Sequence, residues 1–282
     1  MPTATPPSPT PSPAAATLPA YRASGGAFVR AANDGLQING KRFTVRGITL
    51  PRDLWAEDAL LALETDFAHL QQMGANTVRL PLRHAALFAN GAPVPEGFAR
   101  LDAVLRLAAA YNLHVIPVLY TDVPSHALPN TSTVTVLATR YRDEPALLMW
   151  DLRDVATDTL YAQTSRDKAL FWLAQTAAAM HAADPVHPLT TTWRGDPIGT
   201  LASVDVVAVQ FSGSVEDLRR EVAALRQLCT KPVLLSAFCE NDMEALHAVV
   251  RAAEGDRLAG WLLSTTDRPA DPFETLDALL NP

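Results

Sequence analysis

Short apolar runs alternate with longer segments of helical period along most of the chain. The apolar runs are rich in Val, Ile and Leu and have the length of buried strands. The longer segments repeat their apolar residues every three or four positions, which is typical of amphipathic helices. The pattern predicts strands at 43–49, 76–81, 113–119, 146–152, 188–193, 204–210, 231–238 and 258–264. It predicts helices within 57–73, 98–112, 167–183, 214–228 and 241–254.

This alternation of strands and helices predicts the class of fold. Eight strand-and-helix units in about 255 residues indicate a single (β/α)8 TIM barrel, which typically has about 250 residues. An open, doubly wound sheet is the alternative. No glycine-rich phosphate loop follows the first strand, however, so the barrel is favoured.

The segment before the first predicted strand has the pattern of a β-hairpin. Asn39-Gly40 suits a two-residue type I′ turn, and residues on both sides alternate between apolar and polar. We expect this N-terminal hairpin to close the bottom of the barrel, opposite the carboxyl ends of the strands where barrels carry their active sites.

The first residues of the chain have a different composition. Seven prolines fall within the first twenty residues, among Thr, Ser and Ala. We predict a semi-extended linker at 1–25 and a barrel domain at 26–282. Such linkers often join modules of exported carbohydrate-active proteins, and this one lacks the basic start and apolar core of a signal peptide. An extracellular or cell-surface location is therefore expected only if a signal lies upstream.

Composition and charge narrow the classes of function. The chain is 48% hydrophobic and 19% charged, which suits a globular domain. A formal net charge of -7 and the absence of any Lys/Arg run argue against nucleic-acid binding. The apolar runs are far shorter than the roughly 20 residues of a membrane-spanning helix. No metal-ligand spacing, phosphate loop or dinucleotide motif occurs, so neither a metal nor a cofactor is expected.

Four segments resemble one enzyme family in order and spacing. They are "NGKRFTVRGITL", "LQQMGANTVRLPL", "RYRDEPALLMWDLRDV" and "KPVLLSAFCE". Together they resemble the first, second, fourth and seventh strands of glycoside hydrolase family 5 and its clan A relatives, the cellulase-like retaining β-glycosidases. The third segment is similar to the family's Arg-Tyr-Lys-x-x-Pro and Trp-Glu-Leu-x-Asn-Glu-Pro, and the fourth to its Lys-Pro-Val and Glu-Phe-Gly. The resemblance covers about Phe28 to the C-terminus.

The resemblance places the two reactive positions of the family on apolar residues. Retaining glycosidases need two carboxyl groups about 5 Å apart, one as acid/base and one as nucleophile. Val155 stands at the acid/base position and Ala237 at the nucleophile position. Neither side chain can transfer a proton or attack carbon, so the family's hydrolytic mechanism is expected to be absent.

Other site positions of the family have also changed. Asp154 replaces an asparagine that binds the substrate's 2-hydroxyl, Gln210-Phe211-Ser212 replaces His-x-Tyr, and Ser264 replaces a tryptophan. Arg79 keeps its type but loses its usual partner in the family, the nucleophile. A buried guanidinium needs a counter-charge, so Asp154 or Asp151 is its predicted partner. An anionic ligand, such as a uronic-acid sugar, and simple solvation are the alternatives.

Two further sets of residues are candidates for the site. Asp154 and Glu240 are the best candidates for relocated catalytic carboxylates, although neighbouring strand residues face opposite sides and Glu240 has the position of a helix-start acid. Aromatic rings bind the apolar faces of sugars, and ordinary packing is the alternative for the rings at this rim. The candidate substrate-binding residues are Arg79, Tyr120, Asp154, Trp193, Gln210 and Phe211.

Three interpretations of the whole chain follow. The favoured one is a catalytically degenerate glycosidase-like barrel that acts as a carbohydrate-binding or protein-interaction module. The second is an active glycosidase or transglycosidase on β-linked glycans that uses relocated carboxylates. The third is a structural or partner-binding scaffold. The oligosaccharide or polysaccharide, the protein partner and the oligomeric state are left open by the sequence.

Overall fold

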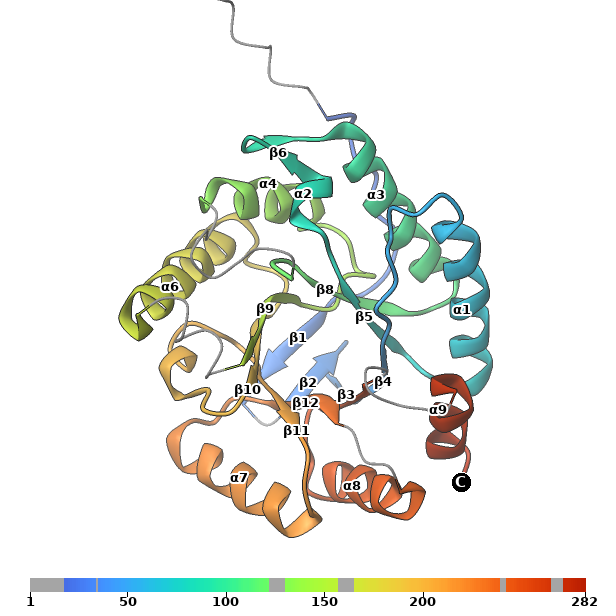
Figure 1. Cartoon of the computed structure of the whole chain (residues 1–282), viewed down its shortest axis with the longest axis vertical. Helices are drawn as coiled ribbons and strands as arrows, with labels where there is room; N and C mark the ends of the chain where they lie inside the picture. Colours follow the sequence, from blue (N-terminus) through green and yellow to red (C-terminus); the bar gives the residue numbers. More distant parts are fainter. Residues whose placement is uncertain (1–17, 34, 122–129, 157–164, 239–241, 265–270) are drawn as a thin grey trace, which may run out of the picture.

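The chain folds into a closed barrel of eight parallel strands surrounded by helices (Figure 1). The computed structural model describes residues 18–282 except 34, 122–129, 157–164, 239–241 and 265–270. Going round the barrel, the strands follow the order β10-β11-β12-β13-β4-β5-β8-β9. This architecture confirms the predicted (β/α)8 barrel.

Each barrel strand overlaps one of the eight predicted strands. The strands are β4 (Val45–Thr49), β5 (Thr77–Pro81), β8 (His114–Val118), β9 (Trp150–Ala156), β10 (Leu189–Arg194), β11 (Val207–Phe211), β12 (Val233–Phe238) and β13 (Gly260–Leu263).

The bounds of β9 differ most from the prediction. The apolar run 146–149 was expected inside the strand, but it precedes it, and only Leu147 forms an isolated bridge to Val115. The strand instead continues through polar residues as far as Ala156. Apolar runs mark burial, and they locate a strand poorly where its carboxyl end lines a polar site.

Helices pack around the strands with their apolar faces inward. They are α1 (Ala59–Met73), α2 (His84–Leu87), α3 (Pro95–Ala110), α4 (Ser132–Tyr141), α6 (Arg166–Ala183), α7 (Val215–Leu228), α8 (Met243–Gly255) and α9 (Pro272–Leu280), with a 3-10 turn η1 (Ile198–Thr200). In α7 the buried residues Leu218, Val222 and Leu225 share one face. Ser214 and Asp217 form a capping box that satisfies free N–H groups at the start of this helix.

None of the described helices has both the length and the apolar character needed to cross a membrane.

A three-stranded antiparallel sheet closes the bottom of the barrel. It comprises β1 (Val29–Ala32), β2 (Gly35–Ile38) and β3 (Lys41–Phe43). The predicted Asn39-Gly40 turn joins β2 to β3 with positive φ angles of 52° and 74°, whereas β1 was not predicted. Val29 and Leu36 belong to a separate apolar cluster with residues in or just before barrel strands, such as Val45, Met149 and Leu234. In Figure 1 this sheet lies across the middle of the barrel. A further hairpin, β6 (Phe88–Ala89) and β7 (Ala92–Pro93), follows α2.

The segment that leads into β1 is attached to the barrel through a buried carboxyl group. Glu144 is 0% exposed and accepts hydrogen bonds from Tyr21 Oη at 2.5 Å, Ser24 N at 2.8 Å and Ala146 N at 2.8 Å. Burial and the hydrogen bond to Glu144 raise the pKa of Tyr21. Leu18 and Tyr21 also pack against the main core. Part of the predicted linker thus contacts the barrel, and a tethering role for residues 1–25 stays a prediction.

Replacing Tyr21 by phenylalanine should destabilise the fold. The variant keeps the ring but removes a donor from a fully buried carboxyl group, so we expect a loss of about 1–3 kcal/mol in the free energy of unfolding, measured by urea denaturation. Tyr111→Phe is the matched control, because its hydroxyl makes only an exposed 3.4 Å contact with Glu64. Equal stability of the two variants would contradict the structural role of Tyr21.

Candidate functional site

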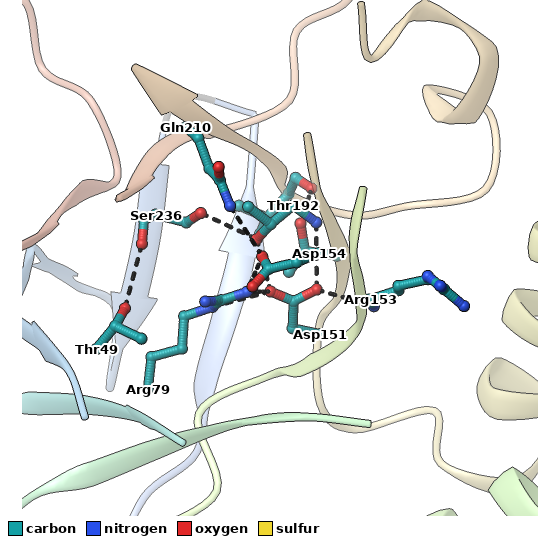
Figure 2. A network of polar contacts seen from close by, with 10 residues as sticks. Thr49, Arg79, Asp151, Arg153, Asp154, Thr192, Gln210 and Ser236 are labelled. Atoms are coloured by element: carbon teal, nitrogen blue, oxygen red, sulfur yellow. Dashed lines mark hydrogen bonds and ion pairs between the residues drawn. The ribbon is translucent and has the colours of Figure 1, made fainter. Parts of the chain in front are cut away.

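A polar network lies near the carboxyl ends of the barrel strands (Figure 2). It joins side chains from five strands of the barrel. The members are Arg79 from β5, Asp151 and Asp154 from β9, Thr192 from β10, Gln210 from β11 and Ser236 from β12.

The centre of the network is a buried ion pair. The side chains of Arg79 and Asp151 are 2% and 1% exposed. Arg79 donates from Nε at 3.1 Å and from Nη2 at 2.8 Å, both to Oδ2 of Asp151. Arg79 Nη2 also donates to Oδ1 of Asp154. The predicted partnership of Arg79 is confirmed, and it involves both aspartates.

Asp151 receives further hydrogen bonds that compensate for its burial. Thr192 donates from Oγ1 to Oδ2 at 2.6 Å and from its backbone N to Oδ1 at 3.2 Å, and the backbone N of Arg153 donates to Oδ1 at 3.2 Å. Ser236 Oγ in turn donates to Thr192 Oγ1 at 2.9 Å. Because both oxygens accept several donors, the carboxyl group is held in one orientation.

Burial and neighbouring charges have opposite effects on the pKa values of Arg79 and Asp151. Burial tends to lower the pKa of Arg79, but the charges of Asp154 and Asp151 outweigh it, so the pKa of this guanidinium is raised and the group stays charged. Burial raises the pKa of Asp151, while the Arg79 charge opposes that rise. Asp151 therefore depends on Arg79 to remain ionised inside the barrel.

A local irregularity of β9 lets both aspartates reach the same arginine. In a regular strand, residues three positions apart face opposite sides. Asp151 pairs with Thr190 on β10, but Asp154 pairs with Thr192, so β9 contains one residue more than β10 over this interval. This β-bulge turns Asp154 toward Arg79. The regular alternation of side chains along a strand does not predict that Asp151 and Asp154 contact the same arginine.

Asp154 connects the buried pair to the solvent side of the mouth. Its side chain is 38% exposed. Gln210 Nε2 donates to Asp154 Oδ1 at 3.3 Å, and Arg194 Nε donates to Gln210 Oε1 at 3.0 Å. A carboxylate, an amide and a guanidinium thus follow one another across β9, β11 and β10. Such a row offers donors and acceptors for hydroxyl groups.

The two positions aligned with the family's reactive residues lie on strands beside this network. Val155 in β9 pairs with Trp193 of β10, and Ala237 in β12 pairs with Gln210 of β11. Glu240, the other candidate for a relocated carboxylate, lies outside the described residues.

The three aromatic candidates are packed into protein. Tyr120, Trp193 and Phe211 are each at most 6% exposed. Tyr120 Oη lies 3.1 Å from Thr133 Oγ1, and Trp193 Nε1 donates to Thr200 Oγ1 at 2.8 Å. Burial raises the pKa of Tyr120 to about 12. These contacts match the packing alternative, and stacking of these rings on a sugar stays a prediction.

Several members of the network were not predicted. Thr192, Ser236 and Arg194 carry hydrogen bonds of the network but were not among the predicted site residues. The run of three threonines at 190–192 within a buried strand was the available signal, because buried hydroxyl groups need partners. Among the described residues, no group of three His, Cys, Asp or Glu side chains could hold a metal ion.

Comparisons with known proteins place this fold among glycoside hydrolases. No family model and no curated protein sequence matches the chain. An endo-1,4-β-mannanase from Rhizomucor miehei superposes with a TM-score of 0.70 at 15% identity, over 90% of this chain and 98% of that one. A β-1,4-D-mannanase from Cryptopygus antarcticus gives 0.69 at 15%, over 91% and 95%. A glycoside hydrolase family 5 mannosidase from Rhizomucor miehei gives 0.65 at 12%, over 88% and 89%.

The chain therefore has the same (β/α)8 barrel as these glycoside hydrolases, which are two β-1,4-mannanases and a family 5 mannosidase. At such low identities the likeness concerns the fold. Activity has to be argued from the residues of the site.

Asparagine substitutions should separate the roles of the two aspartates. Asp151→Asn leaves the Arg79 charge buried without its fully buried carboxylate partner, so we expect a loss of about 3–5 kcal/mol in the free energy of unfolding. Asp154→Asn should cost about 1 kcal/mol or less, because this side chain is partly exposed and an amide oxygen still accepts from Arg79. Urea denaturation measures both, with the exposed Asp143→Asn as the control. Equal losses at 151 and 154 would overturn the assignment of Asp151 as the main partner.

Proposed function

We propose that the chain is a glycosidase-like barrel that binds carbohydrate at its mouth without hydrolysing it. The observation that carries this proposal is that Asp154 is already engaged by other side chains of the barrel. This carboxylate, the best described candidate for relocated chemistry, is bound by Arg79 and Gln210. The positions that resemble the family's acid/base and nucleophile are Val155 and Ala237, which supply no reactive group.

The other described carboxylate of the network is also unsuited to catalysis. Asp151 is buried, and both of its oxygens accept hydrogen bonds. A retaining nucleophile must contact the anomeric carbon, and a general acid must contact the glycosidic oxygen. A side chain closed off by Arg79 and Thr192 does neither. Relocated catalysis would thus need Asp154 together with Glu240.

The polar row at the mouth supports carbohydrate as the class of ligand. Asp154, Gln210 and Arg194 present acceptors and donors at the site where barrel enzymes bind substrates. The structurally similar proteins include two β-1,4-mannanases. A β-linked oligosaccharide is therefore the first ligand to test.

Binding of intact sugar is the test of this proposal. The full chain is immobilised and incubated with plant, bacterial and host oligosaccharides. The retained sugars are then eluted, and their masses are measured by mass spectrometry. We expect at least one β-linked oligosaccharide to be retained and recovered uncleaved, with retention reduced by Asp154→Asn and unchanged by the exposed Asp143→Asn.

Two outcomes would contradict the proposal. Cleaved sugar would favour an active enzyme, and loss of cleavage in both Asp154→Asn and Glu240→Gln would then identify the relocated pair. Absence of binding to every sugar would favour the scaffold interpretation and a protein partner.

A further inference from the structure

A cavity of about 390 Å³ lies at the bottom of the barrel. Its lining comes from the turn that joins β1 to β2, the end of α7, the loop before β12 and the loop before β13. These segments adjoin the amino ends of the barrel strands, so a ligand bound in the cavity leaves the mouth free. The volume suits a small organic ligand. The charged and polar lining residues are Asn33, Arg226, Thr230, Lys231, Asp256 and Arg257.

Two cations of the lining are held by neutral acceptors. Arg226 Nη2 donates to the backbone carbonyl oxygen of Asp256 at 2.6 Å. Lys231 Nζ donates to the carbonyl oxygen of Leu201 at 2.6 Å and also to that of Val204. These carbonyl groups orient the two side chains without cancelling their charges. A guanidinium has five N–H donors and an ammonium has three, so both cations keep donors for a ligand.

Positive charge exceeds negative charge around the cavity. Asp256 forms an ion pair with Arg219 at 2.9 Å, and Asp205, which acts electrostatically on Lys231, pairs with His181 at 2.8 Å. Asp34 adjoins the lining in the sequence and lies outside the described residues. Even with these three carboxylates counted, the cations outnumber them by two, in a chain whose net charge is -7. The five cations are Arg42, Arg219, Arg226, Lys231 and Arg257.

The lining also supplies neutral donors. The backbone N–H groups of Thr230 and Lys231 and the Thr230 hydroxyl donate to no residue that the structure describes. A phosphate monoester has three terminal acceptor oxygens and a charge of about −1.5 to −2 at pH 7, which matches both the donors and the excess of positive charge. A carboxylate offers only two oxygens and one charge.

We propose that this cavity binds a small phosphate monoester. The phosphate group contacts Arg226 and Lys231, whose charge-assisted hydrogen bonds are about twice as strong as neutral ones. The cavity is larger than a phosphate group, so it also holds the group that is esterified to it. This second site lies at the opposite end of the barrel from the mouth, and it does not depend on the proposed function.

Calorimetry with matched three-carbon ligands tests the proposal. Glycerol 3-phosphate, inorganic phosphate, glycerate and glycerol are titrated into the full chain at about pH 7.5, where the phosphate group is mostly doubly charged. At low ionic strength we expect glycerol 3-phosphate to bind with a Kd of about 1 mM or tighter, and each of the other three at least about fivefold more weakly. Added salt should weaken the binding, because the charges are close to solvent.

A pair of variants on α7 provides the control for specific binding. Arg226 is exposed, so Arg226→Gln should leave the fold intact and weaken the binding of glycerol 3-phosphate at least about fivefold. Arg220→Gln removes the same charge from the same helix, but Arg220 pairs with Asp217 and does not line the cavity, so the affinity should stay within about twofold. Equal effects of the two variants would overturn the proposal, as would equal binding of glycerate or of inorganic phosphate.

A thiol in the lining reports where the ligand binds. Cys229 is free and partly buried, and it lines the same cavity. Saturating glycerol 3-phosphate should slow the alkylation of Cys229 by neutral iodoacetamide at least about threefold by covering the thiol, whereas glycerol should not. Mass spectrometry separates this reaction from that of Cys239. Calorimetric binding without protection of Cys229 would place the ligand elsewhere and overturn the proposal, and neither result bears on sugar binding at the mouth.

Discussion

The mouth of this barrel is organised by the need to neutralise one buried arginine. Arg79 is inside the barrel, where an unpaired guanidinium would cost several kcal/mol. In the family that the sequence resembles, the nucleophile is its usual partner, and the resemblance predicts that this position corresponds to Ala237. Asp151 and Asp154 supply the negative charge that Arg79 needs from β9, which is separated from β5 by one strand. The bulge in β9 and the hydrogen bonds of Thr192 and Ser236 support this arrangement.

The barrel and its site have separate physical requirements. The barrel needs layers of apolar side chains and a closed bottom, which the three-stranded sheet and the core provide. None of these features depends on a reactive group at the mouth. The chain thus shares its fold with two mannanases and a mannosidase at 12–15% identity, and the fold by itself does not fix the chemistry at the strand ends.

The fold could be predicted from the sequence further than the site could. Apolar periodicity located the eight strands, because buried strands are rich in apolar residues. The Asn39-Gly40 pair located the turn, because these two residue types adopt positive φ angles readily. The extension of β9 through Arg153 and Asp154 was not predicted, because polar residues that line a barrel mouth have the same sequence pattern as a loop. The burial of Tyr120 and Trp193 depends on contacts with Thr133 of α4 and Thr200 of η1, which the apolar pattern of the strands does not show. The anchoring of Tyr21 on Glu144 joins residues more than a hundred positions apart, which no local pattern shows.

Placing glutamates at Val155 and Ala237 tests most directly whether these two positions correspond to the reactive positions of a retaining glycosidase. The measurement is the release of nitrophenol from aryl β-glucosides, β-mannosides and β-cellobiosides by the native chain and by a Val155→Glu/Ala237→Glu variant. The account predicts no release above the uncatalysed rate by the native chain and measurable release by the double variant, because the resemblance places these two positions where a retaining pair, about 5 Å apart, would stand. Release by the native chain at a rate equal to that of the double variant would contradict it.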